Sequence, residues 1–211
     1  ILLKNFFTKT ISVILAVMVL VSCLTLCFVP ASATTAQNGY DRGYKGGFKG
    51  DGKIYCKGLD LSSWQKDAVN FNAIAAMGYE YIILRLGTSK MTAVDPCFEE
   101  FYAGAKAAGL DVGAYFYSYA TTVDAVNEDI AKCKQWLGDK KFEYPFYFDY
   151  EDKSQADLPT ATALNIINTF IDAFVEEGYL MGLYSMKSWM AQSWITSSSL
   201  PTTYEGWVAH Y

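Results

Sequence analysis

Two carboxylates close an aromatic run at residues 144–152, YPFYFDYED, and their spacing suits acid–base chemistry. Asp149 and Glu151 are two positions apart, so on an extended strand both side chains leave the same face, roughly 7 Å apart at Cβ. Two acids this close repel each other unless one keeps its proton near neutral pH. Glycoside hydrolysis needs such a split, because one acid protonates the leaving oxygen while a carboxylate stabilises or attacks the developing cation. The alternative is a strand that merely ends in solvated acids.

The two acids are expected to differ in environment. Tyr147 shares their face of the strand, whereas Phe146 and Phe148 point the other way. Glu151, as the proton donor, needs apolar surface or a second carboxylate beside it to hold its proton. Asp149 lies nearer the interior, and we expect it to stay ionised and to raise the pKa of Glu151.

From residue 57 onward, helix-like segments alternate with short apolar runs. The helical segments end at glycines, which favour the left-handed conformation after a helix: Gly78, Gly109, Gly138 and Gly178. The last helix is predicted to start after Pro159 with Thr160 as its N-cap. The strand-like runs cover residues 58–65, 79–87, 110–120, 142–151, 179–186 and 205–211. This alternation predicts parallel strands joined by helical crossovers.

The predicted fold class is α/β, an irregular (β/α) TIM-like barrel that is incomplete here at about six strands. An open doubly wound sheet is the alternative. The barrel is favoured because polar and aromatic residues collect at the C-terminal ends of at least four strands, where barrel enzymes place their sites. A doubly wound sheet would instead gather them at one switch point. No glycine-rich phosphate loop follows any of the runs.

The first 33 residues have the pattern of a secretory signal peptide. Two lysines precede an apolar run over residues 11–29, and the small residues 31–33 form a cleavage site. A lipobox-like stretch at residues 20–23 and a retained membrane anchor are the alternatives. Residues 34–53 hold six glycines and almost no aliphatic side chains, so they are predicted to be a flexible linker. The folded domain is therefore expected over residues 54–211.

Charge and cysteine content argue against several kinds of partner. Residues 1–33 contain two of the 17 basic residues and no acid, so the remainder has a net charge of −7 and is a poor match for nucleic acid. After signal cleavage we expect no stable membrane partner and a monomer. Three cysteines then remain, Cys56, Cys97 and Cys133, which argues against a disulfide scaffold. Because His210 is the only histidine and no C-x-x-C pair occurs, neither a metal site nor a cofactor is expected.

Six segments together resemble the family 25 glycoside hydrolases, the muramidases of Chalaropsis lysozyme type. In order they are GLDLSSWQ (58–65), YIILRLG (81–87), VDPCFEEFYAGAKAAGLDVGAYFYSYA (94–120), PFYFDYE (145–151), GLYS (182–185) and WVAHY (207–211). The resemblance covers residues 57–211, and its specific part is the G-[LIV]-D-[LIV]-S-x-W-Q opening combined with D-x-E on the fourth strand. It implies a metal-free hydrolase, secreted or associated with the cell wall. Such an enzyme cleaves the β-1,4 bond between N-acetylmuramic acid and N-acetylglucosamine in peptidoglycan.

The resemblance also implies the site residues. Glu151 matches the proton donor, Asp149 the second carboxylate, and Asp60 the aspartate of the first strand, on the same face as Ser62 and Trp64. The aromatic residues expected to line the sugar groove are Trp64, Tyr115, Tyr117, Tyr184 and Trp207, with Tyr119 a weaker candidate. Whether Asp149 attacks the anomeric carbon or orients a substrate acetamido group is left open by the spacing. Arg85 is expected to form a buried structural ion pair, and His210 to be an ordinary strand residue.

Two other functions compete with this interpretation. A non-catalytic peptidoglycan-binding module would keep the groove but has no use for a repelling acid pair. A chitinase-like hydrolase also ends a strand in D-x-E, but its fuller pattern requires aspartate where this sequence has Tyr147. The family's fold continues through further strands, so the sequence is expected to be truncated at its C-terminus and, as this piece, unstable or weakly active.

Overall fold

The computed structural model of this protein describes residues 48–49, 53–54, 56–190 and 205–209. The signal peptide predicted at residues 1–33 and the strand position of His210 lie outside these ranges. So does most of the linker predicted at residues 34–53. Within that linker, β1 (Phe48–Lys49) and β2 (Lys53–Ile54) form a short antiparallel pair, so this part of the segment is paired backbone rather than a plain spacer.

Six parallel strands form one sheet, and they occur where the apolar runs predict them. They are β3 (Gly58–Leu61), β4 (Tyr81–Thr88), β5 (Asp111–Tyr117), β6 (Phe146–Asp149), β7 (Met181–Met186) and β8 (Glu205–Ala209). Their order in the sheet follows their order in the chain, from β3 at one edge to β8 at the other. A doubly wound sheet would reverse direction at a switch point. The unbroken order is that of a (β/α) barrel.

The sheet is also curled. Trp207 on β8 contacts Tyr115 on β5, three strands away, with ring centroids 6.3 Å apart. The two edge strands, β3 and β8, line a common cavity of about 290 Å³, which would be impossible across a flat sheet of this width. The described strands therefore form part of a barrel, and the predicted incomplete (β/α) barrel is confirmed.

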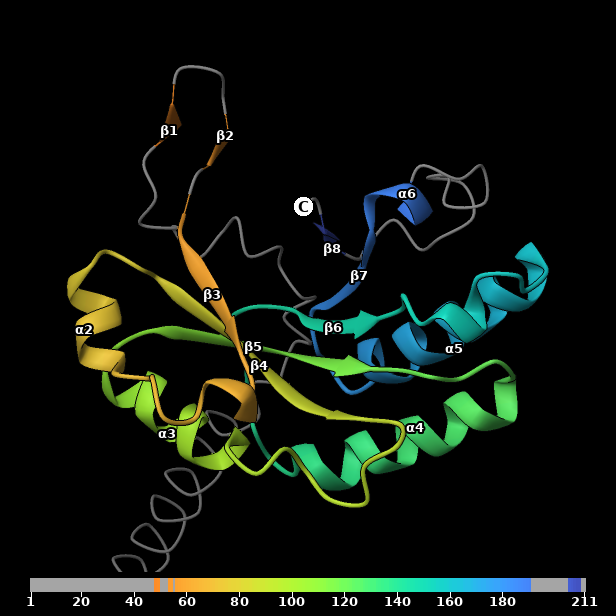
Figure 1. Ribbon diagram of the computed structural model, residues 1–211, viewed down its shortest axis with the longest axis horizontal. Coiled ribbons are helices and arrows are strands. Elements are labelled where there is room, and N and C mark those ends of the chain that lie inside the picture. The colour runs from red at the N-terminus through yellow and green to blue at the C-terminus, as the bar shows by residue number, and fades with distance from the viewer. Residues whose placement is uncertain (1–47, 50–52, 55, 191–204, 210–211) are drawn as a thin grey trace, which may run out of the picture. The chain divides into compact units, whose positions relative to one another are not determined.

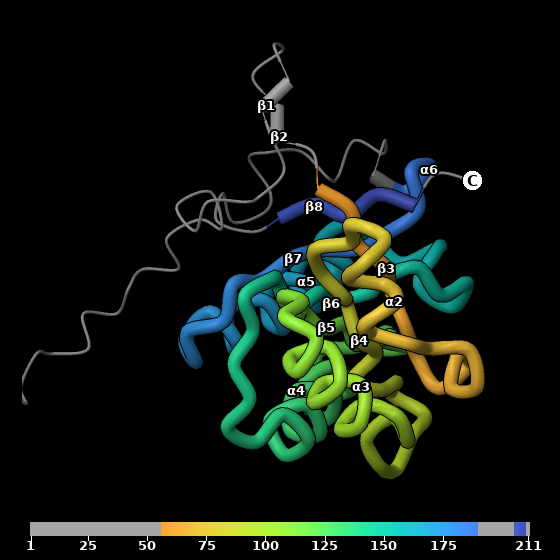
Figure 2. Tube along the Cα trace, turned by 90° about the vertical axis from the view of Figure 1, so that its left-hand side faces the viewer, coloured from red at the N-terminus to blue at the C-terminus, as the bar shows by residue number. Residues whose placement is uncertain are grey.

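Helices connect the strands and cover the outer face of the sheet (Figures 1 and 2). They are α2 (Phe71–Ala76), α3 (Phe98–Ala107), α4 (Val123–Leu137), α5 (Thr160–Val175) and α6 (Lys187–Met190), with short 3-10 turns η2 (Ser63–Gln65) and η3 (Lys153–Gln155). Of these, α3 packs on β4 and β5, while α5 packs on β6 and β7.

The predicted helix ends are largely correct. The four glycines that follow α2, α3, α4 and α5 all have positive φ angles, between 53° and 84°, a conformation that costs glycine little. One start is shifted: α5 begins at Thr160 with Pro159 as its N-cap, and no side chain caps it. Thr160 is therefore the first helical residue rather than the cap, because the fixed φ of proline already directs the chain into the first turn.

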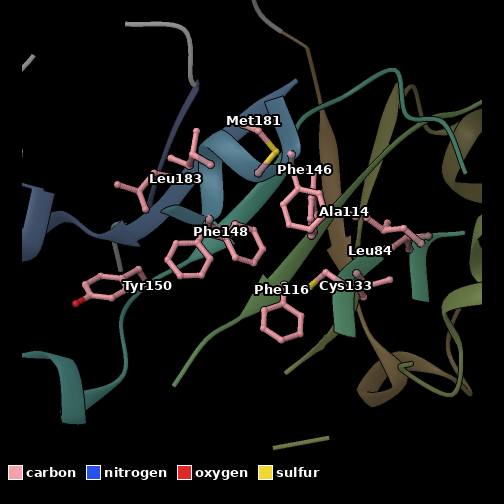
Figure 3. Close-up of a cluster of buried hydrophobic side chains, with 14 of the residues drawn as sticks. Leu84, Ala114, Phe116, Cys133, Phe146, Phe148, Tyr150, Met181 and Leu183 are labelled. Carbon is pink, nitrogen blue, oxygen red and sulfur yellow. The ribbon is translucent and has the colours of Figure 1, made fainter. Parts of the chain in front are cut away.

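The hydrophobic core lies between the outer face of the sheet and these helices. Phe116, Phe146 and Phe148 are fully buried there and pack on the ring of Phe170 in α5, at centroid distances of 4.2 to 6.1 Å. Figure 3 shows side chains of β4 to β7 gathered with Cys133 of α4. Because these aromatic residues alternate with inward-facing ones, core packing fixes which face of β6 carries Tyr147 and Asp149.

The three described cysteines are free thiols. Cys133 is a buried residue of α4, and Cys97 caps the start of α3. In the part of the chain that the structure describes, no helix is both long and apolar enough to cross a membrane.

Candidate active site

One row of side chains crosses the inner face of four neighbouring strands near their C-terminal ends. Tyr117 of β5 is in register with Asp149 of β6, Asp149 with Tyr184 of β7, and Tyr184 with Trp207 of β8. Residues in register on parallel strands project from the same face. The sheet therefore brings a carboxyl group and three aromatic side chains into one layer, although they are spread over 91 residues of sequence.

These side chains line a cavity of about 610 Å³ at the C-terminal end of the sheet. Every predicted site residue except Trp64 lines it: Asp60, Tyr115, Tyr117, Asp149, Glu151, Tyr184 and Trp207. The volume is in the range of small-molecule sites, which are typically about 300 to 1,000 Å³. The C-terminal end of the strands is also where barrel enzymes carry out their chemistry.

Trp64 is the exception, and the prediction that it shares a face with Asp60 is wrong. The chain leaves β3 after Leu61 and turns into η2, so the alternation of a strand does not continue. Ser62 is buried as the cap of this turn, its hydroxyl accepting a hydrogen bond from the Trp64 amide over 3.3 Å. Trp64 itself is 85% exposed and is not among the residues lining the cavity.

Asp149 is the most deeply buried acid of the cavity. Its side chain is 4% exposed, and its Oδ1 atom has no hydrogen-bond partner. Burial raises its pKa well above the ordinary value, and the nearby carboxylates of Glu151 and Asp60 raise it further. A buried acceptor without a donor is costly to fold, so this atom is available to a donor brought by a ligand.

Glu151 lies two residues beyond, where the chain has left β6, and it is only partly buried. Burial alone raises its pKa. Burial raises the pKa of both carboxyls, and that of Asp149 by more, which differs from the expectation of an ionised Asp149 beside a protonated Glu151. Desolvation acts more strongly on the deeper carboxyl, so Asp149 is the acid that burial favours to hold a proton.

Asp60, one residue before the end of β3, lines the same cavity as the pair. Its side chain is exposed, unlike that of Asp149. It acts on Asp149 through space, since its charge is one of the causes that raise the pKa of the Asp149 carboxyl. Three acids therefore line one cavity: Asp60 on β3, Asp149 on β6 and Glu151 just beyond β6.

Aromatic rings form most of the remaining wall. Trp207 packs edge-on against Tyr184, with centroids 4.6 Å apart, and against Tyr147 at 5.1 Å. Burial raises the pKa of Tyr115 and of Tyr117, so both hydroxyls stay neutral hydrogen-bonding groups. Rings with polar tips suit a ligand that has apolar faces and polar edges.

Close packing holds this wall in place. A Cβ atom on Gly182 would overlap the ring of Tyr147, so β7 needs glycine at this register position for β6 to carry a tyrosine. The Tyr147 ring in turn packs against the ring of Trp207.

Arg85 also lines the cavity, and the predicted ion pair is confirmed. Its guanidinium lies 2.6 Å from the carboxylate of Asp95, which is 1% exposed, and its second donor reaches the Ser63 hydroxyl over 3.0 Å. The salt bridge fixes Arg85 at the cavity wall rather than leaving it free.

Sequence reasoning did not assign four other lining residues, and it ranked Tyr119 low. The four are Thr88, Val208, Ala209 and Arg85 itself. Thr88 is the last residue of β4, and Tyr119 lies two residues beyond β5, so their place after the apolar runs was a usable signal. The sequence gives no such signal for Val208, because it lies next to Trp207 and the alternation of a strand predicts it on the other face. Among the described residues, no group of three histidine, cysteine, aspartate or glutamate side chains is placed to hold a metal ion.

Comparison with known families decides the classification. The sequence model of Glycosyl hydrolases family 25 matches residues 59–211, which include the six-stranded sheet except for Gly58, the first residue of β3. The chain belongs to glycoside hydrolase family 25. The resemblance inferred from the sequence motifs is thus confirmed, together with the enzyme class that it implies.

Solved structures of this family share the fold. The chain matches the modular autolysin LytC of Streptococcus pneumoniae with a TM-score of 0.63 and 22% identity, over 78% of this chain and 41% of that one. It matches a muramidase from Trichobolus zukalii with a TM-score of 0.61 and 22% identity, over 74% and 78%. It matches a bacterial lysozyme from Streptomyces coelicolor with a TM-score of 0.60 and 23% identity, over 74% of each chain.

A characterised relative is similar over a shorter stretch. The autolytic lysozyme of Clostridium acetobutylicum is 39% identical over 72 residues, which is 34% of this chain. The matched segment spans 21% of the length of that lysozyme.

Proposed function

We propose that this family 25 protein is a lysozyme, an N-acetylmuramidase that hydrolyses the β-1,4 bond between N-acetylmuramic acid and N-acetylglucosamine in peptidoglycan. The observation that carries the proposal is the carboxyl pair Asp149 and Glu151, both with raised pKa values, in an aromatic-lined cavity of about 610 Å³. The relatives support the substrate: LytC has been solved with a synthetic peptidoglycan ligand, and others are named muramidase or lysozyme.

Glu151 is proposed as the general acid. It is partly buried, which raises its pKa and lets it keep a proton at a pH where an exposed glutamate has lost it. Its position beyond the end of β6, partly open to solvent, suits a group that protonates the glycosidic oxygen and later receives a proton back from water.

Asp149 is proposed to carry the negative charge opposite the developing cation. In the unliganded cavity its burial favours the protonated form, whereas the reactive pair needs a proton on Glu151 and none on Asp149. A substrate N–H that donates to the unpartnered Oδ1 would stabilise the Asp149 carboxylate and move the shared proton to Glu151. The acetamido group of either sugar carries such an N–H. Substrate binding therefore sets the reactive protonation state.

Asp60 and the aromatic wall are proposed to position the sugar. Asp60 faces the carboxyl pair from β3 and can accept hydrogen bonds from sugar hydroxyls. Trp207, Tyr115 and Tyr184 offer ring faces and edges to the sugar C–H groups. Tyr117 adds a hydroxyl that is already hydrogen-bonded to Asp152 over 3.4 Å.

The setting follows from this activity. A lysozyme meets its substrate outside the membrane, so we propose a secreted or wall-associated protein that works as a monomer, with peptidoglycan as its partner. The roles assigned to the side chains require no metal ion or organic cofactor, because two carboxyls suffice for this reaction.

Purified cell walls provide the test. Wild-type protein is expected to release new reducing ends that reduce to muramicitol, while Glu151→Gln releases them about 10² to 10⁴ times more slowly. Glu177→Gln, which removes an exposed acid on the outer face of the protein, serves as the matched control and should match wild type. Equal release by wild type and Glu151→Gln would exclude Glu151 as the acid. Wall binding without release by any variant would favour a binding module, and release from chitin alone would favour a chitinase-like activity.

A further inference from the structure

Acidic side chains line the cavity, and Lys90 lies against the ring of a residue in its wall. Asp60, Asp149 and Glu151 line it, and the one cationic group among the lining residues that the structure describes, Arg85, is paired with Asp95. Lys90 follows the end of β4 and is exposed. Its Nζ atom lies 3.4 Å from the ring centroid of Tyr119, which does line the cavity.

The position of Lys90 is set by the residue before it. The Ser89 hydroxyl donates to the buried carboxylate of Asp129 over 2.7 Å and accepts from the Tyr119 amide over 2.8 Å. The Ser89 amide donates to the Tyr117 carbonyl over 3.1 Å, and Lys132 of α4 donates to the Ser89 carbonyl over 2.5 Å. The turn after β4 is thereby tied to the end of β5 and to α4.

Asp129 fixes both neighbouring turns together. Besides Ser89, the same Oδ2 atom accepts a hydrogen bond from the Ser118 hydroxyl over 2.8 Å. The Ser118 amide in turn donates to the Asp149 carbonyl over 3.0 Å. The Lys90–Tyr119 pair therefore has a defined position relative to the carboxyl pair, with little conformational entropy left to lose on binding.

The Lys90 ammonium keeps its charge available. It makes no ion pair within 4 Å in the part of the chain that the structure describes. Lys90 acts on Asp152 through space, since its charge helps to lower the pKa of Asp152 after the larger effects of hydrogen bonding to Ser154. That carboxylate is already held by the Ser154 hydroxyl at 2.7 Å and by its amide at 3.0 Å.

We propose that Lys90, seated on the ring of Tyr119, is a specificity-determining residue that binds a carboxylate of the glycan substrate at the rim of the cavity. This inference rests on the proposed function, because peptidoglycan bears carboxylates beside its sugars, on the lactyl group or on the attached peptide, whereas chitin bears none. An acidic cavity repels such a substrate. A rim cation offsets that repulsion and selects the anionic glycan over a neutral one.

The interaction is of moderate strength. A cation–π contact at an exposed site is weak, so the ammonium can turn from the ring toward a carboxylate at little cost. The ring and the substrate leave Lys90 partly desolvated, and we expect Lys90→Gln to lower kcat/KM on the anionic substrate about fivefold. Because the effect is electrostatic, it should shrink as the salt concentration rises.

The test compares one glycan in three chemical forms, using the full chain. These are soluble glycan with its peptides, the same glycan with its peptide carboxylates amidated, and glycan freed of peptide, in which the lactyl carboxyl, an amide in the first two forms, becomes a free carboxylate. Wild type, Lys90→Gln and Lys90→Arg are compared, with Lys134→Gln, which removes one positive charge at the far end of α4, as the control.

Lys90→Gln should lose about fivefold in kcat/KM on the anionic glycan and nothing on the amidated glycan, while Lys90→Arg and Lys134→Gln stay within twofold of wild type. An effect that is lost on amidation assigns the bound carboxylate to the peptide; if the peptide-free glycan also shows the Lys90 effect, Lys90 binds the freed lactyl carboxylate as well. Equal losses on anionic and amidated glycan, or none on either, would overturn the role of Lys90 while wild-type turnover still supports the lysozyme activity. Absence of turnover in wild type would overturn both.

Discussion

Glu151 raises the pKa of Asp149, after the larger effect of burial, whereas burial alone raises the pKa of Glu151. The two carboxyls are thus unequal members of one pair. The deeper one is favoured to hold the proton until a ligand donates to it. Their apparent pKa values belong to the pair rather than to either residue.

The pH dependence of activity should show this coupling. We expect kcat/KM on soluble glycan to follow a bell-shaped curve, because the pair must hold a single proton to react. In Asp149→Asn the remaining activity is low and the acid limb disappears, while the alkaline limb from Glu151 persists. An unchanged acid limb in this variant would assign that limb to another group.

The free energy of unfolding should fall as the pH rises through the titration of Asp149, whereas an acid with a lowered pKa has the opposite effect. The pKa of Asp149 is raised on folding, so the folded state loses stability as the pH rises from the ordinary aspartate pKa through the folded one. Asp149→Asn removes this cost. Its melting temperature is expected to exceed that of wild type by a few degrees at pH 7, since about 1 kcal/mol shifts Tm by roughly 2–4 °C in a domain of this size.

The higher melting temperature of Asp149→Asn should disappear at a pH below the ordinary aspartate pKa, because Asp149 of the wild type is then protonated in both the folded and the unfolded state. Asp152→Asn is the matched comparison, because the pKa of Asp152 is lowered by its hydrogen bonds to Ser154. That variant should be destabilised at pH 7, and the loss should fade as the pH falls. A Tm of Asp149→Asn below that of wild type at pH 7 would contradict the assignment of raised pKa to a desolvated Asp149.

Alanine substitutions at two glycines on adjacent strands distinguish steric overlap with a neighbouring ring from the general effect of replacing glycine. Gly182→Ala places a methyl group against the Tyr147 ring, and we expect a loss of about 1–3 kcal/mol in the free energy of unfolding. KM should also rise, because Tyr147 supports Trp207. Gly206→Ala meets no atom within 4 Å and should leave stability and KM near wild type. Denaturant unfolding with parallel kinetics checks both, and equal effects would rule out the steric account.

Two tryptophans distinguish the cavity from the neighbouring surface. Trp207→Ala removes the ring that packs on Tyr115, Tyr147 and Tyr184, and KM for glycan is expected to rise about tenfold, equivalent to roughly 1.4 kcal/mol of binding. Trp64→Ala removes an 85% exposed ring outside the cavity and should leave KM within twofold of wild type. A rise in KM for Trp64→Ala as large as that for Trp207→Ala would extend the glycan site onto η2.

The strands and the carboxyl pair were predictable from the sequence, because both depend on local pattern. Alternation along β6 separates Phe146 and Phe148 from Tyr147 and Asp149, and buried packing on α5 enforces that choice. The positive φ angles of the helix-ending glycines likewise follow from residue type. The chain order of the strands and their register then carry the remaining site residues to one cavity.

What depends on contacts between distant segments was not predictable. Trp64 was misplaced because the strand ends at Leu61, where the Ser62 side chain caps a turn and breaks the alternation. The raised pKa of Asp149 was not predicted because it depends on burial between adjoining strands and on the charges of Glu151 and Asp60. The hydrogen bonds from Ser89 and Ser118 to Asp129 join residues 40 and 11 positions apart, and no pattern in the sequence predicts them.

The most direct test of the central claim follows the side-chain carboxyl carbons of Asp149 and Glu151 by NMR across pH, in the free protein and with a bound N-acetylated glycan fragment. Asp149 is expected to titrate above the ordinary aspartate range in the free protein. On binding, its pKa should fall while that of Glu151 rises. Two carboxyls that titrate in their ordinary ranges, unaltered by the fragment, would contradict the account.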